Sequence, residues 1–295
     1  MIERALVTIG LPVFNSQRYL RQSLESLLAQ TYTNFVLIIS DNASTDDTSR
    51  ICREYADSDS RIKYFRNATN IGNPRNFNRV FELTNTPYLK WSTSDDFWAP
   101  TFLERALEVM EHDPTVALCY PQAWIVDADG HNPMPYDDCL HLMQDDVAER
   151  FVALLQTIKL AHQHLGVIRT SQLRRTHLLG TYSASDITLL AELALYGKFY
   201  ELPERLFFRR FHETSGSWKR GDAKHEAKYY HGADAKKQRG FRHWRGQAGL
   251  YAAVRSSPLP LSAKIATYRY LMRRMIWNRR ELMGELVAYA RSVSR

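Results

Sequence analysis

Runs of apolar residues in the N-terminal part of the chain alternate with segments of helical periodicity. Residues 5–13 and 35–40 are rich in β-branched apolar side chains, which predicts buried strands. Between them, leucines recur at positions 20, 24, 27 and 28, the spacing of an amphipathic helix. A strand, a helix and a second strand in this order form a βαβ unit. We therefore expect a parallel sheet that is buried on both faces.

The same alternation continues to residue 212. The expected strands are 61–65, 88–92 and 116–126, and the expected helices are 44–56, 73–84, 100–113 and 145–161. Ser44 is expected to begin its helix, with Asp46 and Asp47 in the first turn, where carboxylates interact favourably with the helix dipole. Asp95 and Asp96 follow the strand 88–92, and open α/β sheets bind their ligands at that end of the strands.

The last quarter of the chain differs from the rest in composition. From Lys219 onward there are 18 Lys and Arg against 5 Asp and Glu, whereas residues 1–218 hold 21 against 27. Residues 219–246 are polar, basic and interrupted by glycine, which predicts a loop or mobile flap. Residues 262–293 combine apolar residues at helical spacing with arginines, which predicts an amphipathic basic helix or helix pair. We expect one large domain over 1–218 and a basic extension over 219–295.

Bulk composition narrows the class of protein. At 295 residues and 44% hydrophobic, the chain can bury a full core. No stretch approaches the roughly 18 consecutive apolar residues that span a bilayer, and the N-terminus has the pattern of a strand rather than of a signal peptide. Cys52, Cys119 and Cys139 are widely separated and form neither a disulfide framework nor a zinc spacing. The cytoplasm is the expected compartment.

The adjacent carboxylates Asp95 and Asp96 are the first candidates for chemistry. A solvated turn explains them, since Ser and Thr precede them and Pro100 follows. The alternative is a cation site, because neighbouring like charges are costly unless a positive charge lies between them. The pair by itself leaves both interpretations open.

Four segments together resemble the family 2 glycosyltransferases, which have the GT-A fold. They are GLPVFNSQRYLRQSLESLLAQTY at 10–32, SDNASTDDT at 40–48, NIGNPRNFN at 70–78 and STSDDFWAP at 92–100. The resemblance continues through 182–218, so that it covers about residues 5–218. It implies an α/β fold with a Rossmann-like, mostly parallel sheet flanked by helices, followed here by a C-terminal helical extension.

The resemblance also implies residues that bind a nucleotide-sugar donor. Pro12, Phe14 and Asn15 end the first strand, where Phe14 would stack on the base; the alternative for Phe14 is a core side chain. Asp41 would accept a hydrogen bond from the imide N–H of a uracil, and its alternative is an Asx turn or helix cap.

Further donor contacts are implied in two later segments. Arg75 and Asn76 stand together at the start of a predicted helix, and the planar fork of Arg75 would reach the base or a phosphate. The alternative for Arg75 is a solvated arginine on a helix face. Ser94 and Asp96 are implied as contacts from the acidic segment.

A divalent cation is implied as the cofactor. In this family an Asp-x-Asp motif ends the fourth strand, and its last carboxylate binds the metal; here Asp95 stands at that position, although Thr93 replaces the first Asp. The segment RRFHETSGSW resembles the family's Arg-x-His motif, which implies His212 as a further ligand; a structural histidine is the alternative. Such a site suits Mn²⁺ or Mg²⁺.

The catalytic base implied by the resemblance is Asp186, just before a predicted helix, and the alternative is an ordinary N-cap. His162 and His164 are two residues apart and are expected on opposite sides of a helix, so we interpret them as structural or acceptor-facing.

These observations predict an inverting glycosyltransferase that moves a sugar from a nucleotide-diphosphate donor, UDP-linked, to a glycan or lipid-linked acceptor in cell-surface polysaccharide synthesis. The basic helices either contact an anionic membrane surface at its inner face or pack on the catalytic body. A nucleotidyltransferase is one rival interpretation, but LPVFNSQ lacks the expected glycine- and lysine-rich phosphate loop. A nucleic-acid-binding protein is another, and only the basic tail favours it, so we expect no nucleic-acid partner.

Overall fold

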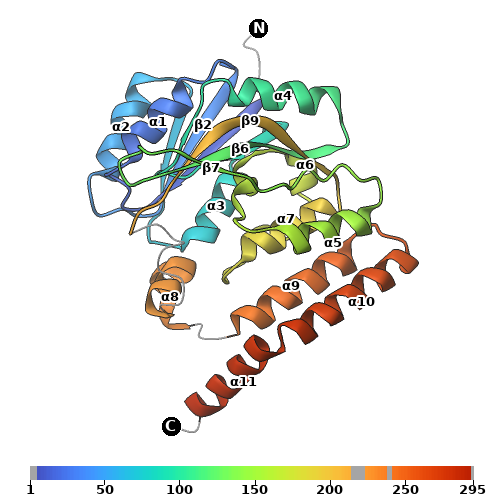
Figure 1. Cartoon of the computed structure of the whole chain (residues 1–295). Coiled ribbons are helices and arrows are strands. Elements are labelled where there is room, and N and C mark those ends of the chain that lie inside the picture. Colours follow the sequence, from blue (N-terminus) through green and yellow to red (C-terminus); the bar gives the residue numbers. More distant parts are fainter. Residues whose placement is uncertain (1–4, 214–222, 238–240, 294–295) are drawn as a thin grey trace.

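One sheet with helices on both sides organises the molecule (Figure 1). The computed structural model describes residues 5–213, 223–237 and 241–293. Within these residues, nine strands form the sheet in the order β3-β2-β1-β4-β8-β6-β9-β5, with β7 paired to β6. The C-terminal helices lie along one side of this body (Figure 1).

The N-terminal half of the sheet follows the predicted alternation of strands and helices. Its elements are β1 (Val7–Val13), α1 (Leu20–Leu28), β2 (Phe35–Asp41), α2 (Thr48–Ser58), β3 (Ile62–Arg66), α3 (Asn73–Glu82) and β4 (Tyr88–Trp91). Strand β1 pairs in parallel with β2 and β4, and β2 pairs in parallel with β3, as expected when helices connect the strands. Every residue of β1 is buried, which accounts for its unbroken apolar sequence.

The second half of the sheet is mixed. It contains β5 (Phe97–Trp98), α4 (Phe102–His112), β6 (Val116–Val126), β7 (Met134–Tyr136), α5 (Val147–Thr157), η1 (His162–Leu165), β8 (Val167–Arg169), α6 (Thr170–Leu173), α7 (Ser185–Ala194) and β9 (Lys198–Arg210). Strand β8 is antiparallel to β4 and β6, and β5 is antiparallel to β9, whereas β6 and β9 are parallel. The predicted α/β GT-A fold is confirmed, and its parallel character belongs mainly to the first half.

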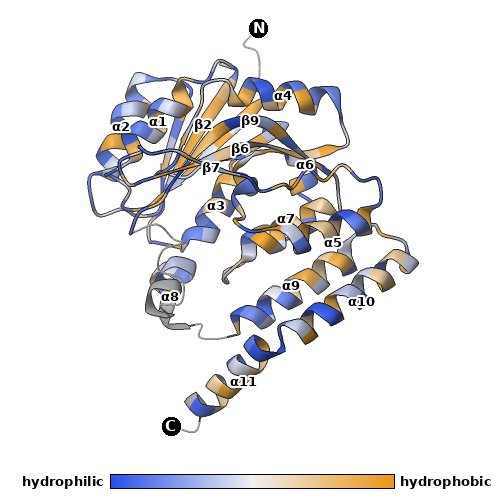
Figure 2. Ribbon diagram, in the orientation of Figure 1, coloured by the Kyte–Doolittle hydropathy of each residue, from blue (hydrophilic) through white to orange (hydrophobic). Residues whose placement is uncertain are grey.

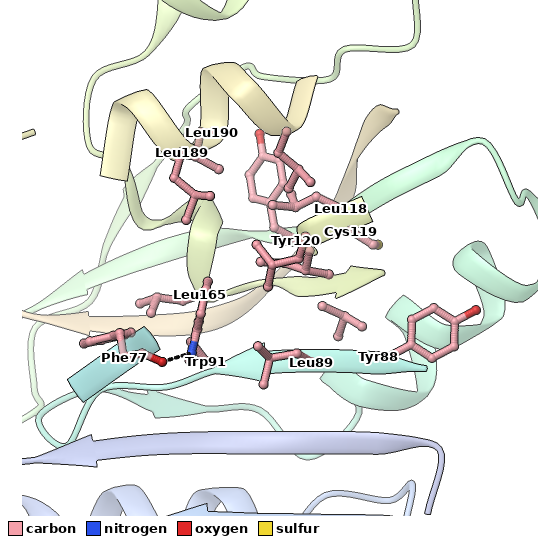
Figure 3. Close-up of a cluster of buried hydrophobic side chains, with 14 of the residues drawn as sticks. Phe77, Tyr88, Leu89, Trp91, Leu118, Cys119, Tyr120, Leu165, Leu189 and Leu190 are labelled. Atoms are coloured by element: carbon pink, nitrogen blue, oxygen red, sulfur yellow. Dashed lines mark hydrogen bonds between the residues drawn. The ribbon is translucent and has the colours of Figure 1, made fainter. Parts of the chain in front are cut away.

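The hydrophobic core contains side chains from both halves of the sheet and from the helices α3 and α7 that pack on it. Figure 3 shows Trp91 of β4 beside Phe77 of α3, with Leu118 and Tyr120 of β6 and Leu189 of α7 in the same cluster. The indole Nε1 of Trp91 donates to the carbonyl of Phe77 at 3.0 Å, so this fully buried ring has no unpaired polar atom.

A close approach of α3 to β1 depends on Gly10. A Cβ atom at this position would lie 2.2 Å from a methyl carbon of Val80. Any larger residue would therefore push α3 away from the strand whose carboxyl end leads to Phe14 and Asn15.

The start of α2 corrects one predicted boundary. The helix begins at Thr48 rather than at Ser44. The backbone N–H of Ser44 donates to Asp41, and the carboxylate of Asp46 accepts from the N–H of Thr48. Because these side chains satisfy the backbone locally, residues 44–47 form a loop, with Asp47 at the N-cap position.

The prediction of a loop over 219–246 is wrong for much of its described part. This stretch contains α8 (Ala223–His231), η2 (Gly232–Lys237) and the start of α9 (Arg242–Ser256), while 219–222 and 238–240 lie outside the described residues. Tertiary contacts hold it: Tyr229 Oη accepts from Asn73 Nδ2 at 2.7 Å, and the N–H of Ala233 donates to the carbonyl of Asn70 at 2.8 Å. These contacts join positions far apart in the sequence, so the local pattern does not reveal them.

The predicted helix pair near the C-terminus is present as α10 (Leu261–Trp277) and α11 (Arg279–Val293). Helix α9 buries Leu250, Ala253 and Val254 in the main hydrophobic cluster. Figure 1 shows α9 between the body and the outer helices α10 and α11. Among the described residues, no helix is both long enough and apolar enough to cross a membrane.

Candidate active site

A cavity of about 510 Å³ opens at the carboxyl ends of β1 and β4. The ends of β9 and α7, together with η1 and α8, complete its walls. Eight of the predicted site residues line it: Pro12, Phe14, Asn15, Ser94, Asp95, Asp96, Asp186 and His212. Three do not, namely Asp41, Arg75 and Asn76. Phe14 is half-buried at this wall and is not a core side chain.

Asp95 and His212 form the candidate metal centre. The imidazole Nε2 of His212 lies 3.0 Å from Asp95 Oδ2; the Asp95 side chain is 28% exposed and that of His212 is 6% exposed. This contact is a hydrogen bond, so a cation bound by both side chains would take the place of the proton between them. Among the described residues, no three His, Cys, Asp or Glu side chains gather as a metal site. A cation would therefore draw its other ligands from the diphosphate and water, and the residues present fit that arrangement.

Arg210, the last residue of β9, holds the segment that contains Asp95 and Asp96 in place through hydrogen bonds. Its guanidinium donates to the carbonyls of Asp95 and Ala128, each at 2.8 Å, and to Gln22 Oε1 at 2.5 Å. It also lies over the ring of Tyr19, 4.5 Å from the ring centroid. The sequence motif contained Arg210 but did not indicate this role, because its partners come from distant segments.

Asp96 is an anchor inside the same segment. Its Oδ1 accepts from the backbone N–H of Arg210 at 2.8 Å, and its Oδ2 accepts from Thr93 Oγ1 at 2.6 Å. Burial, together with the charge of Asp95, raises the pKa of Asp96 to about 7. Thr93, which replaces the first Asp of the family motif, thus supports the buried carboxylate. A donor contact by Asp96 stays a prediction, and both of its oxygens already have protein donors.

A donor contact by Asn76 stays a prediction, and the structure shows this side chain inside the fold. Asn76 is 2% exposed; its Oδ1 accepts from Ser40 Oγ and Asn67 Nδ2, and its Nδ2 donates to the carbonyl of Ser40 at 2.8 Å. The amide thus links α3 to Ser40 of β2 and to Asn67. Sequence position placed Asn76 near the site, but its side chain serves the fold.

Asp41 is bonded within the fold, although the N-cap position of α2 belongs to Asp47. The side chain is fully buried and accepts from the N–H of Ser44, from Ser49 Oγ, from Tyr64 Oη and from Arg66 Nη1. Burial alone would raise the pKa of Asp41, but the hydrogen bonds from Ser44 and Ser49 bring it below its usual value. A contact with uracil stays a prediction, and it would require one of these donors to move.

Arg75 points to a part of the site that the sequence did not reveal. Its guanidinium lies 3.7 Å from Asp234 of η2, and both side chains are about half exposed. The neighbouring α8 contributes Lys228, Tyr229 and Tyr230 to the cavity wall. Their segment was interpreted as a loop, so no sequence signal identified them. A donor contact by Arg75 stays a prediction.

Asp186, the predicted base, also lines the cavity. Asp186 lies in the first turn of α7, and the N-cap position belongs to Ala184 in a left-handed conformation with φ 62°, so the N-cap alternative for Asp186 is wrong. Its Oδ1 accepts only from the adjacent N–H of Ile187 among the hydrogen bonds that the structure describes, at 2.9 Å.

Both histidines of η1 also line the cavity, because this segment is a 3₁₀ turn rather than an α-helix. His164 Nδ1 lies 2.5 Å from the carbonyl of Ala161. Burial lowers the pKa of His164, and the negative charge of Asp186 opposes that shift. His162 Nε2 lies 2.7 Å from the buried Asp138. The two rings have different neighbours, Tyr136 and Phe207 for His162 and Phe77 for His164.

Comparison with solved structures shows the fold. TarS of S. aureus, residues 1–349, in complex with UDP-GlcNAc matches with a TM-score of 0.66 and 16% identity, over 91% of this chain and 72% of that one. The mannosyltransferase PcManGT of Pyrobaculum calidifontis, in complex with GDP-Man and Mn²⁺, matches with a TM-score of 0.54 and 17% identity, over 98% of this chain and 87% of that one.

Sequence comparison shows the family. TuaG of Bacillus subtilis, a glycosyltransferase named for teichuronic acid biosynthesis, is 27% identical over 61% of this chain and 71% of its own. An uncharacterized glycosyltransferase of Haemophilus influenzae is 38% identical, but the match spans 36% of this chain and less than half of that protein, 42%. Residues 8–176 match the family described as glycosyl transferase family 2. The chain therefore belongs to glycosyl transferase family 2.

Proposed function

We propose that this protein transfers a sugar from a UDP-linked donor to an acceptor hydroxyl with inversion at the anomeric carbon. One observation carries the proposal: a single cavity is lined by the hydrogen-bonded pair Asp95 and His212 and also by Asp186. Such a cavity supplies a place for the diphosphate and, across from it, a base for the acceptor.

The residues that line the cavity have separate proposed roles. Asp95 and His212 would hold a Mn²⁺ or Mg²⁺ ion, which supplies positive charge against the departing diphosphate. Phe14 offers an apolar face for the base, and Asn15 fixes its loop by accepting from the N–H of Thr45 at 2.8 Å. Asp186 takes the proton of the attacking hydroxyl, which is a poor nucleophile until deprotonated.

The comparisons support the proposed class of donor, the cation and the setting of the reaction. TarS was solved with UDP-GlcNAc and PcManGT with GDP-Man and Mn²⁺, which supports a nucleotide-sugar donor and a divalent cation here. TuaG supports a role in building a cell-surface polysaccharide. Family membership favours glycosyl transfer over the nucleotidyltransferase alternative. We place the reaction at the cytoplasmic side of the membrane, where a glycan or lipid-linked acceptor would be available.

A thermal-shift screen against UDP-, GDP- and dTDP-sugars, with and without Mn²⁺, tests the proposal. Ligands that bind only the folded state raise its stability in proportion to the logarithm of their concentration over Kd. We expect the largest rise in melting temperature with a UDP-sugar plus Mn²⁺. A larger rise with GDP- or dTDP-sugars would change the donor, and no rise with any of them would refute nucleotide-sugar binding.

A further inference from the structure

Exposed large hydrophobic side chains are concentrated on the two outermost helices. Of the eleven such residues in the described chain, nine lie on α10 and α11, and only Phe65 and Met134 lie elsewhere. Met272 is 60% exposed and Trp277 is 61% exposed. Isolated apolar residues on a surface need no explanation, but a contiguous set marks an interaction site.

On α10 four of the five exposed hydrophobic residues form a stripe that faces away from the body, and Trp277 lies about 100° beyond its edge. At 100° per residue, Leu261, Ile265, Met272 and Ile276 fall within about 60° of one another. The buried Leu271 is more than about 100° from the centre of that stripe. The apolar stripe of α10 is therefore not the surface that packs on the protein.

Helix α11 repeats this arrangement in part, since its exposed Leu286 and Tyr289 lie within about 40° of the buried Leu282. Its inner side carries the buried Leu282 and Glu285, which lies 2.9 Å from His243 Nδ1 of α9. Met283 and Val287, 56% and 46% exposed, lie about 100° or more from Leu282 around the helix. Figure 2 shows hydrophobic and hydrophilic residues alternating along both helices.

Charge decides between the possible occupants of this surface. Residues 261–293 contain seven Lys and Arg against two Glu and no Asp. Arg269 and Arg273 follow the α10 stripe along one edge, about 80–120° from Leu261. A second copy would bring like charges together, whereas the headgroups of an anionic bilayer complement them, and arginine stems can bury while their charges stay at the surface.

The outer helices also reach the acceptor side of the active site. A second cavity, of about 150 Å³, is lined by Ser183 and Ala184 together with Arg242 of α9 and Arg274 of α10. Ser183 and Ala184 directly precede Ser185 and Asp186, which line the main cavity. The loop that leads to the proposed base thus borders a cavity that the C-terminal helices also line.

We propose that the outward face of α10 and α11 docks on an anionic lipid bilayer, with its apolar stripe inserted among the acyl chains and its arginines at the headgroups. Docking in this way would hold the Asp186 side of the cavity near the bilayer, so the acceptor class is a lipid-linked hydroxyl. The acceptor assignment rests on the proposed function, but the docking surface does not.

Flotation with vesicles of phosphatidylcholine, with and without phosphatidylglycerol, tests the surface in the full chain. The wild type is expected to float with the anionic vesicles at low salt and to release at high salt. The double variant Met272→Glu/Ile276→Glu should lower the partition coefficient roughly 10-fold or more. The matched control Phe65→Glu/Met134→Glu changes the two exposed hydrophobic residues on the body and should float like the wild type. Arg269→Gln/Arg273→Gln should weaken binding while leaving the apolar stripe intact.

Three results would overturn the docking surface. They are equal flotation with neutral and anionic vesicles, wild-type flotation of the Met272→Glu/Ile276→Glu variant, and a wild-type dimer in light scattering that this variant converts to a monomer. The last result would make a second copy the occupant. Calorimetric titration with UDP and Mn²⁺ separates the two proposals: flotation without any UDP binding would support the docking surface and refute the proposed donor.

Discussion

Replacement of Arg210 by lysine tests whether this side chain holds the metal-binding segment in place. Arg210 is 3% exposed, and its guanidinium donates three hydrogen bonds, to Asp95, Ala128 and Gln22. Lysine keeps the positive charge but has one nitrogen in place of a planar fork, so it can reach one of these acceptors and leaves two without a donor.

The expected loss follows from those two acceptors. A hydrogen bond to a charged group contributes about 1.5–3 kcal/mol, so Arg210→Lys should destabilise the protein by at least about 3 kcal/mol. For a protein of somewhat more than about 200 residues, 1 kcal/mol corresponds to about 2–4 °C, which gives a fall in melting temperature of about 6–12 °C. Because Asp95 loses its backbone anchor, the affinity for UDP with Mn²⁺ should fall as well.

Differential scanning calorimetry and titration with UDP measure the two effects. Arg50→Lys is the matched control, since Arg50 pairs with Asp47 and Glu54 but is 56% exposed, and it should leave the melting temperature unchanged. A melting temperature of Arg210→Lys within about 2 °C of the wild type would refute the claim that the Arg210 hydrogen bonds stabilise this segment.

Three further predictions concern the site and the fold. Asp95→Ala and His212→Ala should each abolish the gain in UDP affinity that Mn²⁺ gives the wild type; if wild-type affinity in calorimetry is the same with Mn²⁺ and with EDTA, the metal centre is wrong. Asp186→Asn should lower sugar transfer roughly 10²-fold or more, with UDP affinity and melting temperature nearly unchanged; normal transfer would place the base elsewhere. Burial raises the pKa of Glu192, so wild-type stability should fall as pH rises above the unfolded-state value of 4.5 and toward the folded-state value. Glu192→Gln should remove this dependence of stability on pH. If the melting temperatures of the wild type and Glu192→Gln differ by the same amount at every pH, the raised pKa of Glu192 is contradicted.

The sequence predicted the parts of this protein that depend on neighbouring residues. Apolar runs and leucine spacing located β1, α1 and β2, because side-chain periodicity follows directly from local backbone geometry. The position of Asp95 and Asp96 after β4 followed from the same reasoning, since the carboxyl ends of parallel strands meet at one edge of the sheet. The family motifs then brought Asp186 and His212 to the same cavity, although neither is near Asp95 in the sequence.

Tertiary structure decided how individual polar side chains are used. Asn76 and Asp41 stand in the expected segments, but hydrogen bonds from Asn67 and Arg66 hold them inside the fold. A sequence pattern gives the position of such a residue along the chain, whereas its role depends on which distant donors its side chain meets. The hydrogen bonds from Arg210 to Asp95, Ala128 and Gln22 could not be predicted for the same reason.

The C-terminal helices show the same division most clearly. The sequence determined that residues 262–293 are helical, amphipathic and basic, because spacing and charge are local properties. Only the tertiary structure decided which side of α10 is buried: Leu271 faces the protein, whereas Met272 and Ile276 face outward. An amphipathic pattern records that a helix has an apolar side, but the partner of that side is fixed by how the rest of the chain packs.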